Sequence, residues 1–236
     1  MKAVVVGYGA MGKILANMLG DNLAAVCAIE CENKTLDDIK VPFDVIIDFS
    51  NPANLDMIIN YCKKNKKPVV FATTGFNDSE LKKIDDLSKE VPVLRSANFS
   101  LGVILLNKLV KEVTPILKDS FDIEVIEAHH NKKKDAPSGT AKMLVNSIVS
   151  ETGYTVNEGR SGLSPRTKNE VGVSAIRGGT IVGEHEVLYC GEDEVLTSKH
   201  SAYSKKIFAV GAIKAANWLV NKPNGMYDME DVLFTK

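Results

Sequence analysis

Net positive charge, cysteine pairs and long apolar segments are all missing from this sequence. A formal net charge of −1 over 236 residues provides no overall attraction to nucleic acid or to an anionic membrane. The four cysteines form no CxxC pair, and Cys27 and Cys31 have no histidine pair nearby to complete a zinc site. Glycines interrupt the apolar start before a signal peptide could form, and no stretch is long enough to span a bilayer. We therefore expect a cytoplasmic protein with reduced thiols, no metal, no membrane segment and no nucleic-acid partner.

Short apolar segments alternate with helical patterns over the first hundred residues. Strands are expected at 2–6, 23–30, 43–49, 69–76 and 91–99, and helices at 13–19, 54–65 and 78–90. Strands that alternate with helices in this order predict an α/β fold with a Rossmann-like, doubly wound parallel sheet.

The pattern changes after residue 99. A long apolar helix is expected at 101–117, a half-buried strand at 121–130, a second helix at 137–151, and strands at 174–190 and 194–201. Strands with alternating faces and few helices predict a second, α+β domain built on a mixed open sheet. We assign residues 1–98, completed by 208–236, to a dinucleotide-binding domain and residues 99–207 to a substrate-binding and oligomerisation domain.

The first expected strand runs directly into the glycine motif Gly7-Tyr8-Gly9-Ala10-Met11-Gly12. In such a motif the glycines allow a tight turn, close approach of the backbone to a pyrophosphate, and close packing of helix on strand. Glu30 ends the second strand 18 residues after Gly12, where a carboxylate would bind a ribose 2′-hydroxyl and repel a 2′-phosphate. Cys31 offers a phosphate no cation, although Lys34 is close. We expect a dinucleotide, with NADH preferred and NADPH the alternative; a turn that binds another molecule is the competing interpretation.

Two of the four histidines are adjacent in the segment EAHHNKKKDAPSGTA, residues 127–141. Neighbouring side chains diverge and would chelate a metal poorly, so surface histidines or a catalytic segment remain as interpretations. Pro137 fixes the entry to a helix, and the amides of Gly139 and Thr140 at its start would bind a carboxylate. The upstream lysines add positive charge, which favours a small dianion. A nucleic-acid patch would need aromatic residues and net charge that the surroundings lack.

This segment resembles the signature of the 4-hydroxy-tetrahydrodipicolinate reductase family, also called dihydrodipicolinate reductase. Further similar segments are GYGAMGK at 7–13, DFSNP at 48–52, ATTGF at 72–76, SANFSLGV at 96–103, IRGGTIVGEHEVLY at 176–189 and GMYDMEDVL at 225–233. The resemblance covers nearly the whole chain. It implies NAD(P)H-dependent reduction of a cyclic dicarboxylate with loss of water, in diaminopimelate and lysine biosynthesis, by a homotetramer assembled through the open sheet of its substrate domain.

The resemblance also implies roles for individual residues. His129 would be the general acid/base and Lys133 the general acid, and the substrate carboxylates would be held by His130, Gly139 and Thr140. Cofactor contacts would come from Gly7, Gly9, Ala10, Met11, Gly12, Glu30, Phe49, Ala72, Thr74, Ala97, Asn98 and Phe99. The sequence departs from the family at Cys31, where arginine is frequent, and in a shorter segment between Glu30 and Phe43. Another two-domain NAD-linked reductase and a nucleotide sensor that turns over nothing are the alternatives.

Overall fold

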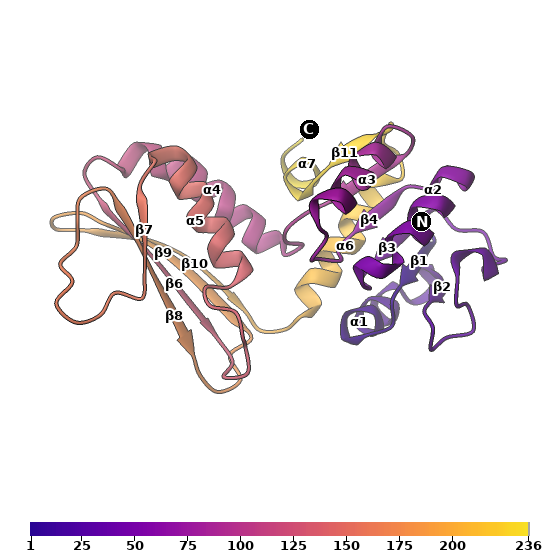
Figure 1. The fold of residues 1–236 in the computed structure, drawn as a ribbon, viewed down its shortest axis with the longest axis horizontal. Helices are drawn as coiled ribbons and strands as arrows, with labels where there is room; N and C mark the ends of the chain where they lie inside the picture. The colour runs from indigo at the N-terminus through magenta and orange to yellow at the C-terminus, as the bar shows by residue number, and fades with distance from the viewer. Residues whose placement is uncertain (236) are drawn as a thin grey trace. The chain divides into compact units, whose positions relative to one another are not determined.

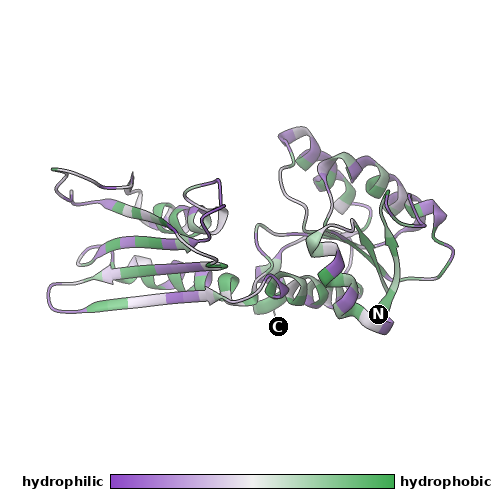
Figure 2. Cartoon of the chain, turned by 90° about the horizontal axis from the view of Figure 1, so that it is seen from below, coloured by the Kyte–Doolittle hydropathy of each residue, from purple (hydrophilic) through white to green (hydrophobic). Residues whose placement is uncertain are grey.

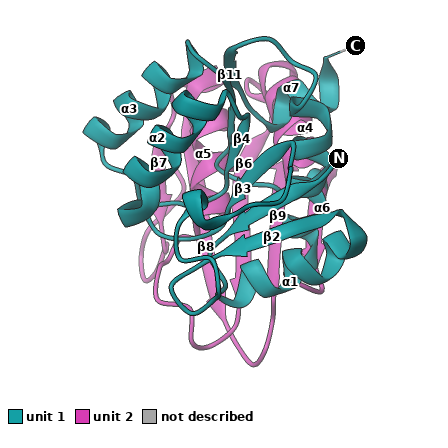
Figure 3. Cartoon of the chain, turned by 90° about the vertical axis from the view of Figure 1, so that its right-hand side faces the viewer, with its two compact units in different colours: residues 1–101, 206–236 teal, residues 102–205 magenta. Residues whose placement is uncertain are grey.

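The computed structural model describes residues 1–235 and divides the chain into two compact units (Figures 1 and 3). Unit 1 comprises residues 1–101 and 206–236, and unit 2 comprises residues 102–205. No helix within the described residues is both long and apolar enough to cross a bilayer.

Unit 1 is built on a six-stranded, wholly parallel sheet in the order β11-β5-β4-β3-β1-β2. This confirms the predicted Rossmann-like sheet. The strands are β1 Ala3–Val6, β2 Leu23–Cys27, β3 Val45–Asp48, β4 Val69–Phe71, β5 Pro92–Arg95 and β11 Gly225–Tyr227. The helices are α1 Ala10–Leu19, α2 Leu55–Asn65, α3 Asp78–Ser88, α6 Lys206–Leu219 and α7 Met229–Phe234. Strand β11 was not predicted, and α1 begins three residues before the expected helix at 13–19.

Both faces of the unit 1 sheet are buried, which explains why its strands have continuous apolar sequences. Side chains alternate across a strand, so Val4, Val6 and Ile46 share a core with α2 and α3. Residues of opposite parity, such as Val5 and Ile47, are equally buried on the face that α1 and α6 cover. Helix α6 can lie close because alanines and glycine form its buried side. A sheet covered on both faces leaves its edges and strand ends for binding.

Unit 2 has a five-stranded mixed sheet in the order β10-β9-β6-β8-β7. This confirms the predicted mixed sheet. Its strands are β6 Asp122–His129, β7 Thr155–Glu158, β8 Glu170–Arg177, β9 Gly183–Cys190 and β10 Val195–Ala202, and its helices are α4 Leu101–Leu117 and α5 Gly139–Thr152. Strand β7 was not predicted. The prediction of strand throughout 174–190 was wrong, because a turn at Gly178 and Gly179 separates β8 from β9; Gly179 has φ +46°, which glycine adopts without strain.

Helices α4 and α5 lie on one face of this sheet (Figure 1). Ile123, Val125 and Val187 on the sheet pack there against Leu106 and Leu144 of the helices. The strands accordingly alternate between hydrophobic and hydrophilic residues along their length (Figure 2). Helices cover both faces of the unit 1 sheet but only one face of the unit 2 sheet, and this difference limits where each unit can bind a ligand.

Candidate active site

In unit 1 the carboxyl ends of β1, β3, β4 and β5 meet at one edge of the parallel sheet. The chain leaves β1 for β2 on one side and continues from β3 to β4 and β5 on the other, so the strand order reverses between β1 and β3. Crevices at such a switch point are where open α/β sheets bind ligands. The loops after these strands carry the predicted cofactor residues of unit 1.

Each glycine position of the motif after β1 favours glycine for a different physical reason. Gly7 has φ +95°, and a Cβ atom there would lie 2.9 Å from the Cα of Ser50. A Cβ on Gly12 would collide with the carbonyl oxygen of Gly7, so only glycine lets α1 approach the turn. A Cβ on Gly9 would meet nothing within 4 Å. Open space beside the second glycine, at the N-terminus of a ten-residue helix, is the geometry that accepts a pyrophosphate.

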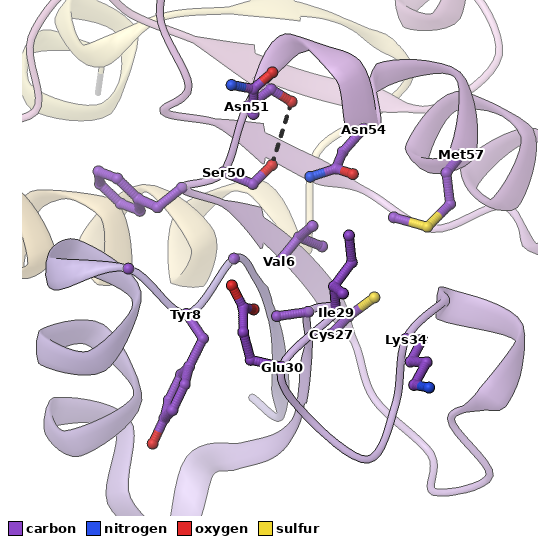
Figure 4. A pocket seen from close by; sticks show the side chains of 14 residues that line it. Val6, Tyr8, Cys27, Ile29, Glu30, Lys34, Ser50, Asn51, Asn54 and Met57 are labelled. Carbon is purple, nitrogen blue, oxygen red and sulfur yellow. Dashed lines mark hydrogen bonds between the residues drawn. The ribbon is translucent and has the colours of Figure 1, made fainter.

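A pocket opens directly beside this turn (Figure 4). Four of the predicted cofactor residues line it: Gly7, Gly9, Glu30 and Phe49. The others lie outside its lining, with Ala10, Met11 and Gly12 in the first turn of α1, Ala72 and Thr74 after β4, and Ala97, Asn98 and Phe99 after β5. Phe99 nevertheless contacts a lining residue, because its ring centroid is 6.2 Å from that of Phe49. Tyr8, inside the predicted glycine turn, and Lys34, noted beside Glu30, also line it; sequence reasoning missed the lining residues Val6, Cys27, Ala28, Ile29, Ser50, Asn51, Asn54 and Met57.

Glu30 lies in a tight turn after β2. The turn is closed by hydrogen bonds from the amide of Ala28 to the carbonyl of Asn33 and from the amide of Cys31 to the carbonyl of Ala28. Lys34 lines the same pocket, but its side chain points away from the Glu30 carboxylate (Figure 4). The carboxylate therefore lies on the glycine side of the pocket without a cation directly opposite it.

Asp48 is the last residue of β3, and its carboxylate links the loop after β3 to the loop after β4. Its carboxylate accepts hydrogen bonds from the Ser50 amide at 3.1 Å and the Ser50 hydroxyl at 2.5 Å, and Thr73 after β4 also bonds to it. Only 1% of Asp48 is exposed, and this burial raises its pKa to about 6, against the lowering effect of its neutral donors. Asp48 therefore carries a buried charge near neutral pH without a cationic partner among these three donors.

In unit 2 the helix-covered face of the sheet changes from apolar to ionisable along the strands. Strand register places Glu127 of β6 opposite His185 of β9, and His185 opposite His200 of β10. His129 and Arg177 are paired one step further along β6 and β8. These side chains point to the same side of the sheet as the core valines and isoleucines, which lie nearer the opposite end of the same strands. The site is thus formed by side chains on the sheet itself.

The Glu127 carboxylate is the centre of this cluster, and its side chain is fully buried. Oε1 accepts hydrogen bonds from Arg177 Nη2 at 2.7 Å and from the Ser138 amide at 3.1 Å. Oε2 is bonded to Arg177 Nη1 at 2.9 Å and to His129 Nδ1 at 2.5 Å. The Ser138 hydroxyl is 3.0 Å from His185 Nε2, and the rings of His129 and His185 meet edge to face at 5.2 Å.

The titration of these groups follows from their burial and partners. Burial would raise the pKa of Glu127, but the hydrogen bonds from Arg177 and His129 outweigh it and hold the pKa below its usual value. Burial lowers the pKa of His129, opposed by Glu127 and reinforced by the charges of Lys133 and Arg177. Burial also lowers the pKa of His185 to about 4. The resting cluster therefore holds an ionised carboxylate and two neutral imidazoles at neutral pH.

The three consecutive lysines in the loop after β6 differ in burial and in their partners. The Lys133 amide donates to the carbonyl of His130 at 3.1 Å, and the Lys133 ammonium is 2.8 Å from Asp135. Lys133 is half-buried, whereas Lys132 and Lys134 are exposed. His129 is the last residue of β6 and His130 is the first residue after it, so the strand ends one residue before the predicted end at 130.

Helix α5 begins where the carboxylate site was expected. Ser138 is its N-cap, and the Ser138 hydroxyl accepts from the Ala141 amide at 3.2 Å. Gly139 and Thr140 are the first two residues of this fourteen-residue helix. Their amides lie at the positive end of the helix dipole, which favours an anion.

Sequence reasoning missed Glu127, Arg177, Ser138 and His185 as parts of one cluster. Glu127 and Ser138 stand inside the histidine-lysine segment, so proximity in sequence could have identified them. Arg177 and His185 required the register of β8 and β9 on β6. No group of three or more histidine, cysteine or acidic side chains suited to a metal occurs in the described part of the chain, and all four cysteines are free thiols.

Comparisons with known proteins identify relatives for both units of the chain. A family model for the N-terminus of dihydrodipicolinate reductase matches residues 1–99, and one for its C-terminus matches residues 102–233. The 4-hydroxy-tetrahydrodipicolinate reductase of Clostridium novyi is 44% identical, over 97% of this chain and 96% of that protein. That of Caldanaerobacter subterraneus subsp. tengcongensis is 42% identical, over 95% and 94%. A dihydrodipicolinate reductase from Paenisporosarcina sp. TG-14, solved with dipicolinate bound, has a similar fold, with TM-score 0.79, 22% identity and coverage of 99% and 100%.

Proposed function

The chain belongs to the dihydrodipicolinate reductase family, and we propose that residues 1–98 with 208–236 bind its nicotinamide cofactor and residues 99–207 its substrate. The protein is an oxidoreductase that reduces 4-hydroxy-tetrahydrodipicolinate to tetrahydrodipicolinate with loss of water, in diaminopimelate and lysine biosynthesis. The observation that supports the division of labour is the pair of sites, a glycine turn with open space in unit 1 and an ionisable cluster beside a helix start in unit 2.

Proton transfer is the step assigned to the loop after β6. When bound, the reduced nicotinamide supplies a hydride. Hydride addition to the conjugated imine of the dehydrated ring leaves an electron-rich carbon that must take a proton. The Lys133 ammonium has a proton to give, and His129 beside it can relay or accept one, so these two residues are the proposed acid/base pair.

Binding of the two substrate carboxylates is assigned to His130, Gly139 and Thr140. A helix start offers backbone amides and a favourable dipole, and the Ser138 cap orients them. The nearby Lys133 and Arg177 add positive charge, which supports a dianion over a neutral ring.

NADH is proposed as the preferred cofactor. Glu30 lies on the glycine side of the pocket, where it would bind a ribose 2′-hydroxyl and repel a 2′-phosphate. Cys31, the next residue, brings no positive charge to a phosphate. Lys34 in the same pocket is the residue through which NADPH could still bind. The remaining predicted cofactor residues, at the carboxyl ends of β4 and β5, are proposed to contact the cofactor beyond this pocket.

A cytoplasmic homotetramer is proposed for the assembled enzyme. The four thiols are free and two of them are buried, as suits a reducing compartment. Helices α4 and α5 cover one face of the unit 2 sheet, and half-buried side chains such as Leu188 and Ile126 lie on its other face. That face is the proposed subunit contact. Light scattering of the purified protein tests whether the protein forms a tetramer.

The function is tested by nicotinamide oxidation with substrate generated in place by a synthase from pyruvate and aspartate semialdehyde. NADH and NADPH are compared in parallel at equal concentration. Rapid oxidation that requires the synthase, with NADH favoured, is the expected result. Tight nucleotide binding without oxidation of either cofactor would contradict the proposal and leave a nucleotide-binding sensor.

A further inference from the structure

We infer that Glu127 is a positioning residue, clamped by Arg177, that fixes the proton of His129 on Nδ1 and so presents Nε2 to the substrate as a hydrogen-bond and proton acceptor. The inference deepens the proposed function, because it rests on the assignment of His129 to the acid/base pair. Glu127 acts only through His129.

The hydrogen bonds of Glu127 leave one arrangement for that proton. A carboxylate has about four acceptor sites and, when ionised, no proton to donate. Each oxygen of Glu127 has two partners, and three of the four are unambiguous donors: two guanidinium nitrogens of Arg177 and the Ser138 amide. The fourth partner is His129 Nδ1 at 2.5 Å, which must therefore be the donor. The hydrogen bond made by one ring nitrogen determines which tautomer a neutral histidine adopts.

Arg177 provides the reason that Glu127 stays ionised while fully buried. The guanidinium grips both oxygens at once, in the bidentate geometry that arginine forms with carboxylates. Arg177 also donates to the carbonyls of Ile176 and Asp135, so its own position is fixed on both sides. The clamp holds the Glu127 carboxylate, and the carboxylate in turn holds the imidazole.

Gly183 of β9 independently indicates that His129 Nε2 needs free space. A Cβ at Gly183 would lie 3.1 Å from Nε2 and 3.4 Å from Cδ2 of the His129 ring. Glycine inside a strand weakens the strand and marks places where another group approaches closely. Here the glycine has an ordinary backbone conformation, with φ outside the left-handed region, so the space beside Nε2 is what requires it.

The charged and titratable groups around the His129 ring come from four elements. Glu127 is on β6, Arg177 on β8, His185 on β9, and Lys133 on the loop after β6. Only Glu127 favours a protonated His129 ring, and burial acts against it. The resting ring is therefore neutral, and Nε2 carries a lone pair.

The tautomer is tested directly by nitrogen NMR on the full chain labelled with ¹⁵N-histidine, above pH 7. With only four histidines, replacement of each by glutamine assigns the signals. We expect His129 to be protonated at Nδ1 in the unaltered protein and to lose that single tautomer in Glu127→Gln. Glu127→Asp, whose carboxylate is one methylene shorter, should show the same loss if the glutamine variant fails to fold.

Kinetics separate positioning from folding. Glu127→Gln should lower kcat by about 10- to 10²-fold, a part of what a positioned acid/base group contributes, with KM for NADH unchanged. The double variant Glu127→Gln/Arg177→Met removes the unpaired guanidinium and should restore melting temperature without restoring kcat. Asp122→Asn, an exposed carboxylate on the same strand, is the matched control and should leave kcat unchanged.

The outcomes are distinct from those of the proposed function. Protonation at Nε2 in the unaltered protein, or full kcat in Glu127→Gln, would overturn the role of Glu127. Absence of turnover by the unaltered protein would refute the reductase assignment, and the NMR signal, which needs no substrate, would still decide the tautomer.

Discussion

The two sheets of this protein form their sites by different means. The unit 1 sheet is covered on both faces, so its site lies beyond the strand ends and is formed largely by backbone, at glycines 7, 9 and 12 and at the start of α1. The unit 2 sheet places its site on its own helix-covered face, where Glu127, His129 and His185 replace apolar residues. A backbone site needs residues with no side chain at set positions, whereas a side-chain site needs strands held in the correct register.

The buried carboxylates of the two units show the same contrast. Asp48 in unit 1 is held by neutral donors, and burial raises its pKa to about 6. Glu170 in unit 2 is held by Thr167 and Arg160, and these hydrogen bonds lower its pKa to about 2. Glu127 is likewise kept ionised by Arg177. Arginine partners thus keep the buried carboxylates of unit 2 ionised, whereas Asp48 of unit 1, held by neutral donors, takes up a proton near pH 6.

The largest effect is expected where the unit 2 site is deprived of its proton donor. Lys133→Ala should lower kcat by about 10² to 10⁴, because that is the usual contribution of a positioned general acid. KM for NADH and the melting temperature should change little, because the Lys133 ammonium pairs only with Asp135 among the ion pairs of the described residues. Steady-state kinetics measure the first, and calorimetry measures the second.

Lys132→Ala is the matched control, because Lys132 is exposed and adjacent. It should leave kcat within about twofold of the original, a minor loss of local potential. Equal losses in both variants would show that the loop contributes only charge, and full turnover in Lys133→Ala would refute the acid role.

The carboxylate contrast predicts an opposite pH dependence for unit 1. Because the folded pKa of Asp48 lies above the ordinary 3.8, its contribution to stability is fully present below pH 4 and is lost as the pH rises to about 6. Two pKa units correspond to about 3 kcal/mol. Asp48→Asn keeps an acceptor for the Ser50 amide and has no charge to bury, so it should be more stable than the original above pH 6 by up to that amount.

Denaturant unfolding from pH 4 to 8 measures this difference. The difference between the two proteins isolates Asp48, because Glu127 and Glu170, whose pKa values are lowered, titrate equally in both. A constant difference across the whole range would show that Asp48 does not titrate there.

The contrast also explains what the sequence could and could not predict. The glycine turn was predictable because the motif is contiguous and each glycine has a local reason. The 101–117 helix and the parallel sheet followed from periodicity alone. Arg177 and His185 were not identifiable, since they reach Glu127 only through strand pairing across about fifty residues of sequence. The β8–β9 turn was missed because apolar residues on both sides of Gly178 and Gly179 continue the strand pattern.

The backbone site of unit 1 can be broken in two ways that should differ. Gly12→Ala forces a Cβ against the Gly7 carbonyl and should cost about 1–3 kcal/mol of stability as well as NADH affinity. Gly9→Ala meets no protein atom within 4 Å, so it should keep its stability and lose NADH affinity because its methyl group occupies the space meant for the pyrophosphate. Calorimetric melting and NADH titration are measured on both. Equal NADH affinity in Gly9→Ala and the original protein would place the pyrophosphate elsewhere.

The smallest effect tests whether a glycine can serve the side-chain site as well. Gly183→Ala would bring a methyl carbon to 3.1 Å from His129 Nε2, a contact that the ring can relieve only by shifting a few tenths of an ångström. We expect kcat to fall about tenfold, the equivalent of about 1.4 kcal/mol, because a small misplacement of a reacting group is costly. NADH affinity should not change, because the atoms nearest to an added Cβ at Gly183 all belong to His129. Gly191→Ala is the comparison: it also crowds a ring, that of Phe121, but at the far end of β9. If both variants lowered kcat equally, the effect would come from distortion of the strand and not from the contact with His129. The side-chain site would then have no specific requirement for glycine at position 183.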